Sequence, residues 1–179
     1  MSMANLVPEP VLAAVGDLTI SFANLEMHVE LVVWSLVSSN TRIGQAITSE
    51  LGFSRLPVIA LSIYRELHGE DEDFMQLQEL MKQSLSMAEE RNSLIHSVWG
   101  VGDSEDSAIR AKVTAKLKHG VRFDSHPVDV AEVRAAAERM RVISGQILLF
   151  VSRLMRTGKS PSQFQRLPSD LATGESNDS

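Results

Sequence analysis

The 179-residue chain is long enough for one domain with a hydrophobic core, since a domain averages roughly 150 residues. Apolar residues make up 44% of it and charged residues 22%, which is typical of a soluble globular protein. The chain contains no cysteine, so disulfide frameworks, thiolate zinc sites, iron–sulfur clusters and cysteine nucleophiles are excluded.

The formal net charge of -6 argues against a general nucleic-acid coat protein, but the charge is distributed unevenly. Residues 1–107 contain 5 Lys/Arg and 16 Asp/Glu, whereas residues 108–179 contain 12 and 7. A basic surface in the second half is therefore compatible with an acidic protein.

Neither a transmembrane segment nor a targeting segment is apparent in the sequence. The apolar runs at 29–37 and 147–151 are shorter than the roughly 18–20 residues that span a bilayer. The first ten residues contain neither a basic region nor a signal-like apolar core. We therefore expect a cytoplasmic protein with no membrane partner.

Apolar residues recur every three or four positions over most of the chain, which is the pattern of helices with one buried face. They predict three long and two short helices, at 10–37, 41–51, 54–67, 71–95 and 128–155. Gly52 lies between the two short helices as an expected helix C-cap.

Between the last two long helices the period changes to two, which indicates β-structure. A strand at 111–117 is expected to pair with 97–101 through the turn-rich segment 102–107. Val121 and Phe123 can add a short third segment before Ser125-His126-Pro127.

The order of these elements predicts a mainly α fold. We expect a helical bundle of two long helices, two short helices and a closing long helix, with a β-hairpin insertion near 97–123. Residues 1–157 form one domain in this prediction. Residues 158–179 are rich in Ser, Gly, Pro and Asp, which predicts a disordered tail.

Three strongly hydrogen-bonding side chains, Arg91, Asn92 and His96, are concentrated at the end of the helix predicted at 71–95. Asn92 and His96 are four residues apart and share a helix face. Arg91 lies about 100° round the helix from Asn92, so all three can rim one groove.

These side chains have the chemistry needed to cleave RNA without a metal ion. Arg91 is a permanent cation that can bind phosphate oxygens with two parallel donors. His96 can accept or donate a proton near neutral pH. A base that takes the proton of a ribose 2′-hydroxyl, beside a fixed cation at the phosphorus, is sufficient for the reaction, and Asn92 can orient either neighbour or bind phosphate.

A structural role is the alternative for the same residues. An arginine near a helix end often only forms ion pairs, here with Glu89, Glu90 or Glu26 on another helix. A histidine in the last turn often caps carbonyl groups.

The segment RNSLIH at 91–96 resembles the Arg-x4-6-His motif of HEPN domains, in which a polar residue, most often Asn, follows the Arg. The predicted helix order resembles that of HEPN domains over residues 10–156. HEPN proteins are small α-helical bundles, frequently homodimers, and many are metal-independent endoribonucleases of toxin–antitoxin, phage-defence or RNA-processing systems.

The resemblance implies that Arg91 and His96 are the catalytic pair and that Asn92 supports them. It also implies a homodimer in which two copies form one composite cleft, with RNA as substrate and an antitoxin or regulatory protein as a further partner. Val98 stands where the toxin subgroup controlled by a nucleotidyltransferase antitoxin has a tyrosine, so control by modification of that tyrosine is not implied.

Basic side chains alternate along the predicted hairpin and could attract an RNA backbone in a salt-dependent way. They are Lys112, Lys116 and Lys118, with Arg110 and Arg122 nearby. Trp99 could stack on a base. The alternatives are a solvated lysine face that discourages pairing between sheet edges and a tryptophan packed under the hairpin.

The sequence contains no HExxH motif, no histidine pair with a nearby carboxylate and no glycine-rich phosphate loop. We therefore expect no metal site and no cofactor. The sequence predicts a metal-independent endoribonuclease of the HEPN type, related to toxin or defence systems. The alternative is a HEPN-derived binding or dimerisation module without catalysis; a third, a bundle that binds a small ligand, has no residue pattern of its own.

Overall fold

The computed structural model describes residues 7–38, 40–104, 106–116 and 120–161, and at 113–116 and 120–123 it describes the backbone alone. The predicted fold class is confirmed: the described chain is mainly helical, with one small antiparallel sheet before the last helix. In chain order the elements are α1 (Glu9–Val37), α2 (Thr41–Thr48), the 3-10 turn η1 (Phe53–Arg55), α3 (Leu56–His68), α4 (Glu72–Ile95), β1 (Val98–Val101), β2 (Ser107–Lys116), β3 (Gly120–Asp129) and α5 (Val130–Arg156).

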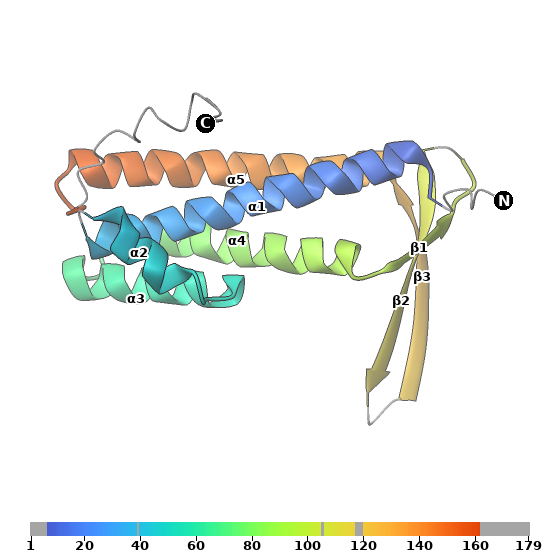
Figure 1. The fold of residues 1–179 in the computed structure, drawn as a ribbon, viewed down its shortest axis with the longest axis horizontal. Helices are drawn as coiled ribbons and strands as arrows, with labels where there is room; N and C mark the ends of the chain where they lie inside the picture. The colour runs from blue at the N-terminus through green and yellow to red at the C-terminus, as the bar shows by residue number, and fades with distance from the viewer. Residues whose placement is uncertain (1–6, 39, 105, 117–119, 162–179) are drawn as a thin grey trace, which may run out of the picture.

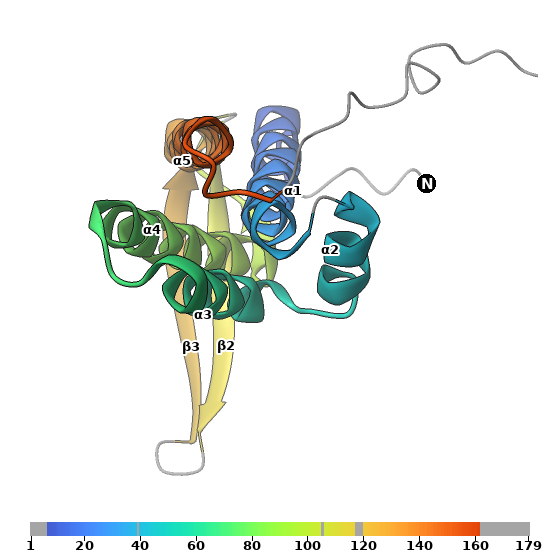
Figure 2. The same ribbon diagram turned by 90° about the vertical axis from the view of Figure 1, so that its left-hand side faces the viewer.

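Three long helices form the body of the molecule (Figure 1). α1 and α5 lie side by side and run in the same direction, whereas α4 packs against both and runs in the opposite direction. α3 lies against α4, and α2 lies beside α1 at the end of the bundle away from the sheet (Figure 2). The hydrophobic core between these helices is continuous, which fits a single domain.

α1 is the central helix, and Pro10 in its first turn is tolerated there because the first N–H groups of a helix have no partner inside it. Its apolar stripe, from Val11 to Leu36, is buried in the bundle. Among the described residues, α1 is also the only single helix that is long and apolar enough by composition to cross a membrane. The sequence prediction did not identify α1 as such a helix, because it considered only uninterrupted apolar runs and polar residues are interspersed along α1. The cytoplasmic location stays a prediction.

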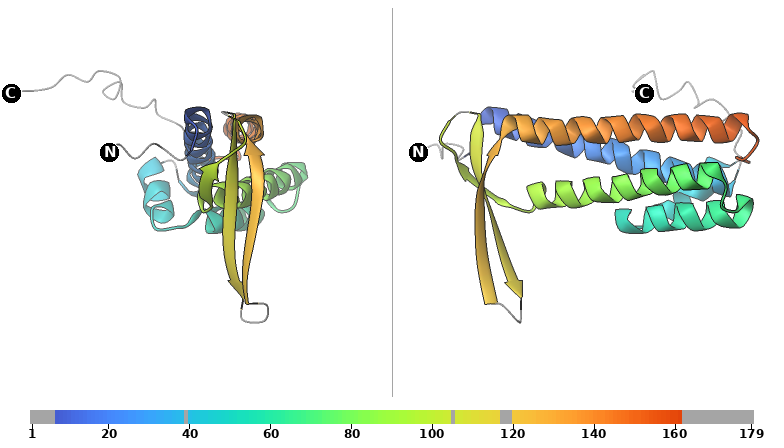
Figure 3. Two further views of the ribbon diagram at one scale, coloured as in Figure 1. Left: turned by 90° about the vertical axis from the view of Figure 1, so that its right-hand side faces the viewer. Right: turned by 180° about the vertical axis from the view of Figure 1, so that it is seen from behind.

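The sheet has the order β1-β2-β3 and is antiparallel throughout. β1 pairs only with the first part of β2, from Ala108 to Ala111, and the rest of β2 pairs with β3 alone. Figure 3 shows this two-stranded ribbon extending away from the end of the bundle, crosswise to the helices. The sheet therefore stands at the end of α4 at which the chain leaves the helix.

β3 corrects the sequence prediction. We expected a short segment near Val121 and Phe123 and a break at Ser125-His126-Pro127, but β3 continues through these residues to Asp129. A proline is tolerated because β3 is an edge strand, so a missing N–H interrupts no second ladder. Asp129 then caps α5, since its Oδ1 accepts a hydrogen bond from the N–H of Ala131 (2.8 Å).

The short helices differ from the prediction at their junction. α2 begins after Asn40, whose Oδ1 accepts from the N–H of Arg42 (3.1 Å), but it ends at Thr48 rather than near residue 51. Gly52 precedes η1 in an extended conformation and does not cap α2.

Close packing of α2 on α1 holds this region in place. A Cβ atom at Gly44 would lie 2.6 Å from the Trp34 side chain, so only glycine fits at this contact. The Trp34 indole also donates a hydrogen bond to Thr48 Oγ1 (2.9 Å). Beyond α2, η1 brings Phe53 against Phe22 of α1, with ring centroids 5.0 Å apart.

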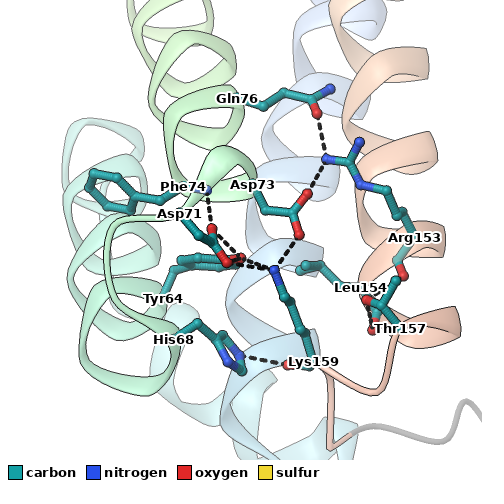
Figure 4. Close-up of polar contacts among 10 residues, drawn as sticks. All are labelled: Tyr64, His68, Asp71, Asp73, Phe74, Gln76, Arg153, Leu154, Thr157 and Lys159. Atoms are coloured by element: carbon teal, nitrogen blue, oxygen red, sulfur yellow. Dashed lines mark hydrogen bonds and ion pairs between the residues drawn. The ribbon is translucent and has the colours of Figure 1, made fainter.

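A network at the start of α4, which we call the Lys159 clasp, consists of Tyr64, Asp71, Asp73, Arg153 and Lys159 (Figure 4). The Lys159 ammonium donates to Asp71 Oδ2 (2.6 Å) and to Asp73 Oδ2 (2.5 Å). The Tyr64 hydroxyl donates to Asp71 Oδ1 (3.0 Å), and Arg153 forms an ion pair with Asp73 (2.6 Å). The clasp thus joins α3, α4 and the segment after α5.

The clasp also bears on the predicted tail. Gly158 ends α5 with a positive φ of 72°, as expected of a helix-terminating glycine. We predicted disorder from residue 158, but Lys159 lies in the clasp and the Ser160 hydroxyl donates to the carbonyl of Ser35 (2.5 Å). Residues 162–179, the rest of that predicted tail, lie outside the described residues.

Candidate active site at the C-terminal end of α4

Arg91 and Asn92 occupy the last turns of α4 and contact each other. Arg91 Nη1 donates a hydrogen bond to Asn92 Oδ1 (2.9 Å). The Arg91 guanidinium also lies over the ring of Phe22 on α1, with its central carbon 5.0 Å from the ring centroid. Phe22 and Asn92 therefore fix the guanidinium from two sides, and a cation over an aromatic face is a favourable contact.

The carboxylates that could have neutralised Arg91 do not do so. Glu90 forms an ion pair with Arg139 of α5 (2.5 Å) instead. Glu26 and Glu89 lie near Arg91, yet within the described part of the chain Arg91 forms no ion pair. Of the five N–H donors of Arg91, only the one that binds Asn92 Oδ1 has an acceptor among the described residues, and Arg91 Nε is buried without a partner. Arg110 Nε and Arg153 Nε are buried without a partner in the same way, so the unused terminal donors, rather than Nε, are what set Arg91 apart.

His96 stands at the C-cap position of α4, and its backbone N–H donates to the carbonyl of Asn92 (3.1 Å). Other residues satisfy the carbonyls of this last turn: Ser97 Oγ donates to Ser93 (2.6 Å) and Trp99 Nε1 donates to Leu94 (3.1 Å). The His96 side chain is exposed and has no hydrogen bond or ion pair with any residue that the structure describes. Its imidazole is therefore not used to cap the helix.

A cavity of about 390 Å³, which we call the Arg91 pocket, opens beside these residues. It lies between α1, η1 and α4, and its lining residues are Phe22, Glu26, Phe53, Ser54, Leu85, Ala88, Glu89, Arg91 and Asn92. Leu85, Glu89 and Asn92 follow one another at helical intervals, and His96 comes four residues later. His96 therefore continues the stripe of α4 that lines the pocket.

The structure brings two of the three predicted catalytic residues together in one chain. Arg91 and Asn92 are hydrogen-bonded, and His96 follows one helical turn later, about 6 Å further along the helix axis. Among the described residues, no contact joins Arg91 to His96 directly. A site that uses both groups needs either a substrate that bridges them or a second copy of the chain.

Trp99, which was predicted to stack on a base, is partly buried. It packs against the hydrophobic core, and its indole N–H is used on the Leu94 carbonyl. These contacts favour the packing role that was the alternative to base stacking. Its neighbour across the sheet, Arg110, donates from Nη1 to Ser93 Oγ (3.1 Å) and so ties β2 to the end of α4.

The lysines lie further out on the ribbon. Lys112 is exposed, and the strand register places it opposite Asp124, which is also exposed. Lys116 ends β2 opposite Gly120, and nothing is described of its side chain. Lys118 lies outside the described residues.

Two aromatic residues of the site were missed in the sequence. Phe22 and Phe53 are 31 positions apart, and the packing of η1 against α1 brings their rings into contact beside Arg91, whose guanidinium lies over Phe22. The position of Arg110 could be predicted from the sequence, because it is two residues from Lys112 in the same strand and therefore lies on the same face. Across the described residues, no three His, Asp or Glu side chains converge as they would around a metal ion.

No protein-family model, curated protein or solved structure matches this chain.

Proposed function

We propose that this protein is a metal-independent endoribonuclease of the HEPN type that cleaves RNA with Arg91, Asn92 and His96. One observation carries the proposal. Within the described residues, the side chains of Arg91 and His96, which the RNSLIH motif singles out, form neither the ion pairs nor the carbonyl contacts expected of a structural role at the end of α4.

The reaction follows from the chemistry of these side chains. His96 takes the proton from a ribose 2′-hydroxyl, and the oxygen forms a bond to the adjacent phosphorus. Arg91 stabilises the charge on the phosphoryl oxygens, and Asn92 holds the Arg91 guanidinium in place through a hydrogen bond. The bond from phosphorus to the 5′ oxygen breaks, and that oxygen takes a proton from His96 of the partner subunit. The products are a 2′,3′-cyclic phosphate and a 5′-hydroxyl.

The partner subunit enters because, among the described residues of one chain, no contact joins Arg91 to His96, and we propose a second copy rather than the substrate alone as the link. Two copies that approach through the ends of their α4 helices would supply two imidazoles and two guanidinium groups to one cleft. A homodimer would sediment with twice the 19.7 kDa chain mass. A monomeric protein that cleaves RNA at full rate would contradict this part of the proposal.

The rival function is a HEPN-derived binding or dimerisation module without catalysis. The specific observation in its favour is that two carboxylates, Glu26 and Glu89, line the pocket beside Arg91. Negative charge there disfavours the phosphate that a nuclease must bind.

Cleavage of a mixed RNA in EDTA separates the two functions. We expect the parent to cut the RNA, and both Arg91→Ala and His96→Ala to lose at least about two orders of magnitude in rate. His126→Ala is the matched control, because His126 is also an exposed histidine but lies on β3, outside the proposed site. If the parent cuts no RNA at low salt, or if His96→Ala and His126→Ala behave alike, the binding module is the better account.

A further inference from the structure

The Arg91 pocket has a composition that the proposed reaction at the phosphate does not use. Its lining includes the aromatic rings of Phe22 and Phe53 and the carboxylates of Glu26 and Glu89, and none of these four side chains has a role in that reaction. At about 390 Å³ it falls in the range of pockets that hold small molecules, roughly 300–1,000 Å³. The pocket therefore has room for part of a substrate other than the phosphate.

The charges in the pocket indicate what that part is. Neither Glu26 nor Glu89 has a hydrogen bond or ion pair within the described residues, so their oxygens are free to accept. Burial raises the pKa of Glu30 on the same helix, and the charge of Glu26 adds to that effect. Carboxylates without an ion-pair partner repel an anion and favour a cation or a group that carries N–H donors.

One aromatic ring is available to hold a flat group. Phe22 is buried and its ring is covered by the Arg91 guanidinium. Phe53 is half-buried, lines the pocket and is fixed by its tilted contact with Phe22. A nucleobase that enters the pocket can stack on Phe53, and such stacking is nearly independent of which base it is.

A carboxylate in the pocket can distinguish the bases by the hydrogen-bond donors on their edges. A carboxylate accepts hydrogen bonds and, when ionised, donates none. Guanine carries two adjacent donors, N1–H and the N2 amino group, which can bind both oxygens of one carboxylate. Adenine and cytosine place an acceptor nitrogen beside their amino group, and uracil places a carbonyl on each side of its single N–H, so each sets an acceptor against the carboxylate.

We propose that the Arg91 pocket binds a guanine base of the RNA, with Glu26 reading the N1–H and N2 edge and Phe53 stacking on its face. Glu26 is the reader because it is half-buried on α1, whereas Glu89 is exposed at the rim. Arg91 and Asn92 then meet the phosphate attached to that nucleoside, and His96 lies beyond them on the same stripe of α4. The choice of RNA as the ligand rests on the proposed function.

Binding of mononucleotides tests the site without requiring cleavage. The four ribonucleoside monophosphates, each as its 3′ and its 5′ isomer, are titrated into the full-length protein by calorimetry. We expect guanosine monophosphate to bind at least about tenfold more tightly than the other three, which is the effect of one charge-assisted hydrogen-bond pair.

Three variants assign this preference to residues. Glu26→Gln replaces an acceptor with a donor, so it should lose about tenfold or more for guanosine monophosphate and gain relative affinity for adenosine monophosphate. Glu89→Gln makes the same charge change at the rim and should keep the preference. Phe53→Leu should weaken all four nucleotides to a similar extent, because it removes the ring and retains an apolar wall.

The outcomes separate this site from the nuclease itself. Equal affinity for the four bases, no binding of any of them, or equal effects of Glu26→Gln and Glu89→Gln would overturn the guanine site. RNA cleavage without base preference would also overturn it and leave the nuclease standing. Guanine preference in a protein that cuts no RNA would support the site and remove the nuclease.

Discussion

The two ends of α4 use charged residues in opposite ways. At its start, Asp71 and Asp73 are matched by Lys159 and Arg153, and the Tyr64 hydroxyl donates to Asp71. At its end, one donor of Arg91 is used on Asn92, and the His96 imidazole has no hydrogen bond or ion pair within the described residues. The same helix thus carries a closed network at one end and free binding capacity at the other.

The comparison indicates that the start of α4 serves stability and that its end serves binding. A closed network contributes to folding, because each charged group there has its partner. An unpaired Nε is not part of the contrast between the two ends, because Arg153 of the clasp has one as well as Arg91. A half-buried arginine without an ion pair contributes less to folding. Local departures of this kind are expected at functional sites, where a ligand supplies the missing partners.

The largest contrast is expected between His96→Ala and Lys159→Ala. The first should reduce RNA cleavage by about 10²- to 10⁴-fold and leave the unfolding temperature unchanged, because the side chain is exposed. The second should lower the unfolding temperature and leave the cleavage rate per folded molecule unchanged. Cleavage assays and thermal unfolding on both variants measure this, and an equal loss of stability in the two would erase the distinction between the ends.

A smaller effect is expected for the cap that belongs to the closed end. Asp71 accepts a hydrogen bond from the N–H of Phe74 (2.9 Å) as the N-cap of α4, in addition to its contact with Lys159. Asp71→Ala should reduce the free energy of unfolding by about 1–2 kcal/mol, most of it from the lost cap. Asp124→Ala, an exposed carboxylate on β3, is the control and should change stability little. Urea titration gives both values, and an Asp71→Ala variant as stable as the parent would contradict the contribution of both the cap and the contact with Lys159.

The closed end should also respond to acid. Lys159, assisted by the N–H of Phe74, lowers the pKa of Asp71 to about 2 from its ordinary value of 3.8. A carboxylate whose pKa is lowered in the folded state stabilises the protein fully at a pH above its unfolded-state pKa. This contribution is lost as the pH falls toward the folded-state pKa of about 2. The parent should therefore be more stable than Asp71→Asn at pH 5, and the difference should shrink between about pH 4 and pH 2. A difference that stays constant over that window would count against the ionised contact.

The smallest effect is expected on the ribbon. Lys112 is exposed, and a lysine that contacts an RNA phosphate contributes about one unit to the salt dependence of binding. Lys112→Ala in a His96→Ala background should reduce the slope of log affinity against log salt by about that amount. An unchanged slope would favour a solvated face, and Lys82→Ala on α4 provides the comparison.

Much of the fold could be predicted from the sequence because its helices carry their own signals. The apolar period located α1, α4 and α5 to within a few residues of their observed ends. The errors came where partners decide the structure. Pro127 was read as a break because proline disfavours central strands, and nothing local shows that β3 lies at an edge. Lys159 was placed in a tail because its two aspartates are more than 80 residues away.

The candidate site could be predicted only in part for the same reason. Arg91, Asn92 and His96 are neighbours in the chain, so their spacing was visible in the sequence. Phe53 and Glu26 reach the same pocket only through the packing of α1 and η1. The freedom of His96 was also not visible, since it depends on Ser97 and Trp99 taking the carbonyls of the last turn.

The most direct test of the free end is the chemistry of the cut. A short RNA that the protein cleaves is compared in EDTA with a copy carrying a 2′-deoxy nucleotide at the cut position, and the fragment ends are identified by mass spectrometry. Attack by the 2′-hydroxyl under the control of His96 predicts a 2′,3′-cyclic phosphate and a 5′-hydroxyl from the first RNA. It predicts no cut at that position in the second RNA and none by His96→Ala. Cleavage at the deoxy position, or equal cleavage by His96→Ala, would contradict the account.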